Sequence, residues 1–224
     1  MKLTEEQITY IENYIKSFDI KYYEVYMEIL DHMILSVEAI LEENKEITFE
    51  DAVLKAKVDG FGKKGFRGMM DEKLKLAQNQ ARKQNNKMIK EYFTFPKIMM
   101  TIAVFVGFFL FLMLFDDPRK SYVFSSATVF FIGLFQYFYF NKFLKIKKLY
   151  ILKAQMINVG FSLFFSVFQL SNSVLVLGKE TIDFNHVLMR LFMTFVFTFS
   201  LISLLVYIEI RKKTIEEIKT QIFV

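Results

Sequence analysis

The chain has 224 residues, of which 54% are hydrophobic and 17% aromatic, and it contains no Cys. The missing Cys excludes a disulfide scaffold, a thiol nucleophile and Cys-ligated zinc. The net charge of +5 is unevenly distributed: residues 1–59 hold 6 basic and 14 acidic side chains, whereas residues 60–94 hold 9 and 3. The rest of the chain combines long apolar runs with basic loops. This pattern favours a lipid bilayer over nucleic acid as a partner.

Residues 1–62 predict three short helices with one apolar face each. Thr4 and Gln7 form a capping-box pattern at the start of the first helix. A longer helix follows over 20–43, and Thr48 caps the third. Gly62 ends that helix, because glycine tolerates the left-handed backbone of a helix terminus. We expect an acidic three-helix headpiece that needs its neighbours for full stability.

The headpiece carries three short motifs: Glu28-Ile29-Leu30-Asp31-His32, Thr48-Phe49-Glu50-Asp51-Ala52 and Phe61-Gly62. Together they resemble a helical module found at the N-terminus of bacterial membrane proteins, as in the HAAS signalling domain and the permease-prefix domain. Asn44-Lys45 stands where that module usually has Gly, and Asp51-Ala52 replaces the commoner Glu-Ala. The resemblance implies an intracellular regulatory or docking domain on a membrane anchor, and no chemistry. It assigns a fold role to Glu28, Asp31, His32, Ala52, Phe61 and Gly62.

Glu28 and His32 stand one helical turn apart, and Asp31 adds a second carboxylate. Such a set can contribute to a metal site, but a closed site needs further ligands, and the headpiece has no second histidine. We therefore expect His32 to pack or to cap, with a hydrogen bond to a neighbouring helix. No metal or cofactor is predicted.

Residues 63–94 predict a basic helical connector. The favoured interpretation is a solvated helix along the bundle or the membrane surface, and the alternative is a short self-associating stalk. Its Lys and Arg side chains can attract anionic headgroups.

Four apolar runs follow within residues 95–210, each near the roughly 20 residues that a helix needs to cross a bilayer. They cover 98–115, 122–140, 154–178 and 187–208. The fold class is thus an all-α integral membrane protein, with a headpiece, a connector, a four-helix transmembrane bundle and a tail at 211–224.

The Lys and Arg residues that flank these runs predict the orientation. Fifteen of them lie before the first run, between the second and third, or after the fourth, and three lie in the other two loops. Because cytoplasmic loops are enriched in Lys and Arg, we expect both termini in the cytoplasm and short external turns at 116–121 and 179–186.

The third run carries polar residues at spacings of three and four, so they form one stripe along a helix. Polar groups face lipid only at a cost, and the stripe is expected to face inward towards the second and fourth runs. Helix–helix hydrogen bonding is the favoured role, and a hydrated path or an oligomer interface are the alternatives. The stripe is Gln155, Asn158, Ser162, Ser166, Gln169 and Ser173.

His186 and Arg190 lie one turn apart at the start of the fourth run. Snorkelling of Arg190 to the surface is the favoured interpretation, and contact with an anionic headgroup or pairing with Asp183 are the alternatives. The pair is therefore a candidate headgroup site.

No nucleotide-binding, metalloprotease or nucleophile-elbow motif is present, and we expect no enzymatic activity and no catalytic residue. The expected function is that of a bacterial inner-membrane signalling or accessory protein that presents the headpiece to an unidentified protein partner. A small transport component that uses the stripe is the alternative. The lipid bilayer is the other expected partner, a homo-oligomer is possible, and no nucleic acid is expected.

Overall fold

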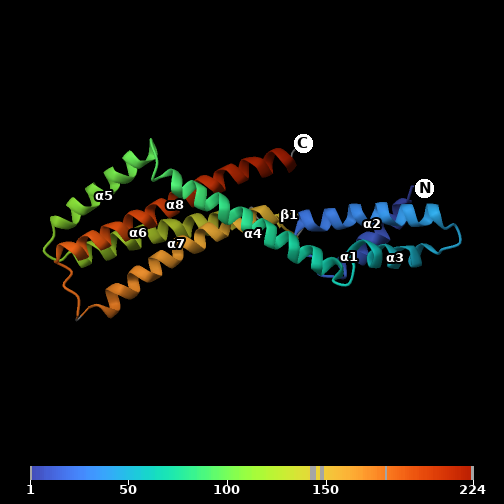
Figure 1. The fold of residues 1–224 in the computed structure, drawn as a ribbon, viewed down its shortest axis with the longest axis horizontal. Coiled ribbons are helices and arrows are strands. Elements are labelled where there is room, and N and C mark those ends of the chain that lie inside the picture. Colours follow the sequence, from blue (N-terminus) through green and yellow to red (C-terminus); the bar gives the residue numbers. More distant parts are fainter. Residues whose placement is uncertain (1, 142–144, 147–148, 180, 223–224) are drawn as a thin grey trace. The chain divides into compact units, whose positions relative to one another are not determined.

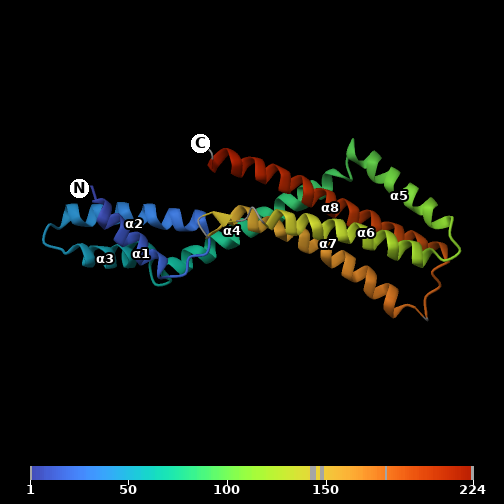
Figure 2. The same cartoon turned by 180° about the vertical axis from the view of Figure 1, so that it is seen from behind.

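The computed structural model describes residues 2–141, 145–146, 149–179 and 181–222. These residues form helices α1 to α8 and one short β-hairpin, which confirms the all-α class (Figures 1 and 2). The chain divides into two compact units. The headpiece unit comprises Met1–Asn79 and Leu144–Gln155, and the span unit comprises Gln80–Phe143 and Met156–Val224.

Local capping signals begin and end the headpiece helices α1 (Glu5–Lys16), α2 (Tyr23–Glu43) and α3 (Phe49–Phe61). The Thr4 hydroxyl accepts a hydrogen bond from the Gln7 amide, and the Gln7 side chain accepts one from the Thr4 amide, as the capping box requires. Thr48 accepts from the amide of Asp51. Gly62 has a φ of 58°, a conformation that other residues adopt only with strain. The three predicted helices are therefore confirmed.

The headpiece core includes a residue that the sequence assigned to the connector. Phe66, in the first turn of α4 (Gly65–Glu91), is 1% exposed. Its ring packs edge-on against Phe18 at 5.1 Å and against Phe61 at 4.7 Å between centroids. Aromatic pairs in this geometry are favourable beyond their buried area. The headpiece therefore extends into the start of the connector.

A short antiparallel hairpin also belongs to the headpiece unit, although the sequence shows no strand pattern. Strand β1 (Lys145–Ile146) pairs with β2 (Leu149–Tyr150). The Tyr150 amide donates to the carbonyl of Lys21 at 2.9 Å. The segment that precedes α7 (Leu152–Leu177) therefore packs on the headpiece.

The span unit contains α5 (Lys97–Met113), α6 (Pro118–Asn141) and α8 (Val187–Ile222), with most of α7. Three helices, α6, α7 and α8, are long and apolar enough to cross a membrane. Helix α5 has 17 residues, or about 25 Å, which is shorter than the predicted run 98–115 and than a hydrocarbon core of about 30 Å. Helix α8 continues to Ile222, so the described part of the predicted tail, residues 211–222, is helical.

Packing in the span unit depends on aromatic contacts. One buried cluster joins α5, α6, α7, α8 and the loop before α8, through Phe108, Leu112, Tyr122, Leu175, Phe184 and Met193. Phe108 stacks on Phe197 at 3.7 Å. Gly133 of α6 lies so close to Phe164 of α7 that an added Cβ would come within 2.5 Å of the ring. Many large apolar side chains elsewhere on these helices are exposed, such as Phe124, Phe131 and Phe135, and they are compatible with lipid contact.

Candidate functional site: the Lys97 end of the span unit

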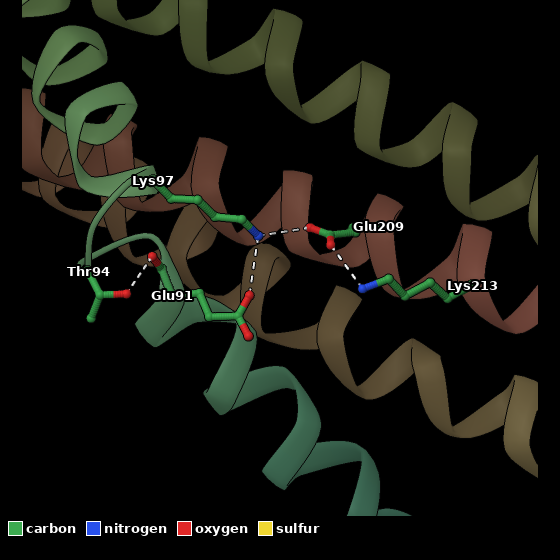
Figure 3. Close-up of polar contacts among 5 residues, drawn as sticks. All are labelled: Glu91, Thr94, Lys97, Glu209 and Lys213. Carbon is green, nitrogen blue, oxygen red and sulfur yellow. Dashed lines mark hydrogen bonds and ion pairs between the residues drawn. The ribbon is translucent and has the colours of Figure 1, made fainter.

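One end of the span unit, called here the Lys97 end, joins three helical segments by charged side chains. The Lys97 ammonium donates to Glu91 Oε2 at 3.3 Å and to Glu209 Oε2 at 3.4 Å (Figure 3). Lys213 donates to the other Glu209 oxygen at 3.1 Å. The side chains are about one-third to one-half exposed, so each ion pair stabilises only modestly. The network connects the end of α4, the start of α5 and the far part of α8.

Tyr92 follows Glu91 and lies under the same ammonium. Lys97 Nζ is 4.8 Å from the Tyr92 ring centroid, a cation–π geometry. Burial is the main cause that raises the pKa of Tyr92 above its ordinary value, while the positive charge of Lys97 acts in the opposite direction. The Tyr92 hydroxyl therefore stays protonated at neutral pH.

Arg211 lies on α8 near this network but takes no part in it. Its side chain is 6% exposed. Nη1 donates to the main-chain carbonyl of Gln136 on α6 at 3.1 Å, and Cζ is 6.0 Å from the Tyr139 ring centroid. Nε–H has no acceptor within the part of the chain that the structure describes. Arg211 is one of the basic residues that follow the fourth apolar run, and its burial has no local signal in the sequence.

Other buried polar groups gather at the Lys97 end. The Tyr207 side chain is fully buried, its ring is 5.5 Å from that of Phe161, and its hydroxyl has no partner. Asn85 of α4 is buried against Gly160 of α7, where an added Cβ would be 3.1 Å from Asn85 Oδ1. Helices α4, α7 and α8 therefore meet around polar side chains.

The polar stripe of α7 does not face inward as expected. Ser162, Ser166, Gln169 and Ser173 are exposed, while Gln155 and Asn158 are half-buried. The three serine hydroxyls donate to carbonyls of their own helix at 2.7–3.0 Å, so they need no partner on another helix. The face of α7 that packs on α6 is aromatic instead, with Phe161 on Tyr137 and Phe168 on Phe130.

Two residues of the stripe have buried side-chain oxygens that could accept a hydrogen bond. Gln155 Oε1 and Asn158 Oδ1 are buried and have no hydrogen-bond partner among the described residues. In the single chain, the last four residues of the stripe are thus exposed and the first two half-buried, and the role of the stripe stays a prediction.

Arg190 and His186 form internal caps at the opposite end of the span unit, called here the Arg190 end. Arg190 Nη1 donates to the carbonyl of Leu112 at 2.7 Å, and its Nε and Nη2 donate to the carbonyl and side chain of Asn185. His186 Nδ1 accepts from the Leu188 amide. The Leu112 carbonyl is among those that the end of α5 leaves without a helical partner. Arg190 thus caps α5. Asp183, the alternative partner predicted for Arg190, instead accepts a hydrogen bond from the Asn185 amide.

The headpiece motif is spread over the headpiece surface. Glu28 pairs with Lys73 of α4 at 2.6 Å. Asp31 and His32 are exposed, and the His32 ring lies edge-on to Phe61 at 6.4 Å. His32 therefore packs against an aromatic ring of α3 at the surface. Within the described ranges, no group of three or more His, Asp or Glu is placed to hold a metal ion.

No family model matches the chain, and no curated protein or solved structure matches it either. The resemblance of residues 1–62 to the HAAS and permease-prefix modules therefore rests on the motifs alone.

Proposed function

We propose that the protein is a non-enzymatic signalling or accessory protein of the bacterial inner membrane, in which a cytoplasmic headpiece binds a protein partner. The observation that carries the proposal is a hydrogen-bonded link between the headpiece and the start of a membrane-length helix. Glu24 of α2 accepts from the amide of Leu152 at 2.8 Å and from that of Lys153 at 3.4 Å. These amides open α7, one of the three membrane-length helices.

A carboxylate at a helix N-terminus satisfies amides that have no helical partner and interacts favourably with the helix dipole. Because Glu24 comes from a segment far away in sequence, this cap depends on the position of the headpiece helix. A partner that shifts α2 would weaken the cap and change the first turn of α7. The neighbouring Tyr22 forms an isolated backbone β-bridge with Tyr150 of the hairpin. Burial is the main cause that raises the pKa of Tyr22, and the proximity of Tyr150 raises it further.

The contacts of α5 support the proposed four-span topology. Lys97, at the start of α5, pairs with Glu209, whereas Leu112, near its end, accepts from Arg190. Helix α5 therefore runs antiparallel to α8 over the stretch from 209 back to 190. Since α8 is a membrane-length helix, we infer that α5 crosses with it despite its 17 residues. Local thinning of the bilayer or snorkelling of flanking side chains accommodates a mismatch of a few Å.

The headpiece surface favours a basic partner with apolar side chains. Residues 1–59 carry 14 acidic and 6 basic side chains. A cavity of about 580 Å³ lies between α1 and α2, with the charged Glu12, Lys16 and Asp19 beside Tyr23, Met27 and Leu30. Leu35 on α2 is 64% exposed. A headpiece with excess negative charge and exposed apolar side chains suits a basic amphipathic segment.

Site-specific photocrosslinking in cells tests this proposal. A photoreactive amino acid at Leu35 should give one protein adduct of constant mass, and Asp31→Lys should weaken it, because it reverses a nearby charge. The same probe at Lys120, on α6, is the control and should give no such adduct. Adducts at Leu35 only with lipid or with a second copy of the chain would contradict the proposal.

The transport alternative requires the stripe of α7 to line a solvated path. Four of the six stripe residues lie on an exposed face, and no described contact encloses them. We therefore do not propose transport.

A further inference from the structure

The guanidinium of Arg211 has more donors than the protein satisfies. Arginine carries five N–H donors in a planar fork and stays protonated in proteins. Among the described residues, Arg211 has one hydrogen-bond acceptor, the Gln136 carbonyl, and one aromatic neighbour, Tyr139. The side chain is nevertheless 94% buried, since its exposed fraction is 6%. Buried charges in proteins are paired, because an unpaired charge loses its hydration without compensation.

Glu209, the carboxylate closest to Arg211 in the sequence of α8, already pairs with other side chains. Both Glu209 oxygens accept from lysines, one from Lys97 and one from Lys213. The α8 residue one turn before Arg211 is Tyr207, whose buried hydroxyl also has no partner. Residues four apart lie on the same helix face. Among the described residues, this face therefore offers a cation and a hydroxyl and no free anion.

The position of Arg211, just after the apolar run of α8, is the level at which lipid phosphates are expected. The apolar run of α8 ends at Ile208, three residues before Arg211, and Tyr137, Tyr139 and Tyr207 lie on α6 and α8 at this level. Tyrosines of this kind mark the membrane–water interface, where the headgroups lie. A soluble anion would have to reach a buried group at this level, whereas a lipid phosphate is already there.

We propose that Arg211 binds the phosphate of an anionic phospholipid whose headgroup enters between α6 and α8. The guanidinium fork matches two phosphate oxygens in a bidentate arrangement, and the Tyr207 hydroxyl is a further donor on the same face. The inference rests on the membrane embedding of the proposed function, and it is independent of partner binding by the headpiece.

Native mass spectrometry of the full chain in mild detergent tests the inference, with phosphatidylglycerol and phosphatidylcholine added separately. The wild type should retain phosphatidylglycerol in preference to phosphatidylcholine. Arg211→Gln should weaken phosphatidylglycerol retention by roughly tenfold or more, because a hydrogen bond to a charged group is lost. Lys212→Gln is the matched control, since Lys212 is adjacent and exposed, and it should retain the lipid like the wild type.

Two further variants keep the test informative if Arg211→Gln does not fold. Arg211→Lys keeps the positive charge but lacks the planar guanidinium that can contact two phosphate oxygens. It should bind phosphatidylglycerol with intermediate strength. Tyr207→Phe removes only the hydroxyl and should bind a few times more weakly. Equal retention of both lipids by the wild type, or equal loss in the Arg211 and Lys212 variants, would overturn the inference. Displacement of the lipid by millimolar inorganic phosphate would also overturn it, because the site would then take a soluble anion.

Discussion

The two ends of the span unit each contain an arginine on α8, and the two differ in what surrounds them. Arg190 is partly exposed and donates to the Leu112 carbonyl and to Asn185. Arg211 is buried and has one carbonyl acceptor. The apolar cluster around Phe108 lies at the Arg190 end, whereas buried polar groups collect at the Lys97 end. An arginine saturated by its own chain serves structure, and one left unsaturated is the better candidate for binding.

The largest expected effect is from breaking the Arg190 cap. Arg190→Leu leaves the Leu112 carbonyl and the Asn185 side chain without their donors, and we expect a loss of about 2–4 kcal/mol in unfolding free energy. Unfolding by denaturing detergent in mixed micelles measures this loss. Leu188→Ala, at a nearby exposed position, serves as the control and should stay near the wild type. A loss below about 0.5 kcal/mol for Arg190→Leu would mean that the cap is not structural.

A second cap, at the start of α7, should have a smaller effect. Glu24→Ala removes the acceptor of the Leu152 and Lys153 amides, and loss of an N-terminal cap costs about 1 kcal/mol. Hydrogen exchange at these two amides should accelerate, while amides in the middle of α7 stay protected. Unchanged exchange at Leu152 would show that the headpiece does not hold the start of α7.

The ion-pair network at the Lys97 end should contribute less to the unfolding free energy than either cap. Lys97→Met leaves Glu91 without its lysine and Glu209 with only Lys213. These groups are partly exposed, and such pairs are worth about 0.2–1 kcal/mol. The loss should shrink at high salt, because screening weakens exposed ion pairs. A loss that is larger and independent of salt would indicate a buried role for Lys97.

The smallest effect is expected on the exposed stripe of α7. Ser162→Ala and Ser166→Ala remove hydroxyls that bond only to their own helix, and we expect changes within about 0.5 kcal/mol for the monomer. Unfolding in mixed micelles at low protein concentration measures them. A larger, concentration-dependent loss would instead indicate that a second copy covers this face.

The sequence predicted what local signals encode. Thr4, Thr48 and Gly62 mark the headpiece helices because caps act over three or four residues, and apolar runs mark α6, α7 and α8. Contacts between distant segments left no such signal: Phe66 joins the headpiece core and Glu24 caps α7, although neither has a local pattern for that role. Arg190 and Arg211 show the limit most clearly. Both are basic residues near the end of an apolar run, and only packing shows that the first is saturated and the second is not.

The central claim is that the Lys97 end and the Arg190 end lie on opposite faces of one membrane, with α5 crossing beside α8. The chain has no Cys, so single cysteines can be placed at exposed positions of each end: Lys87 and Lys212, and Lys120 and Lys179. In intact cells, an impermeant maleimide should label Lys120→Cys and Lys179→Cys and spare Lys87→Cys and Lys212→Cys until the membrane is opened. Labelling of Lys87→Cys but not Lys212→Cys, or the reverse, would contradict the account, because α5 would then not cross.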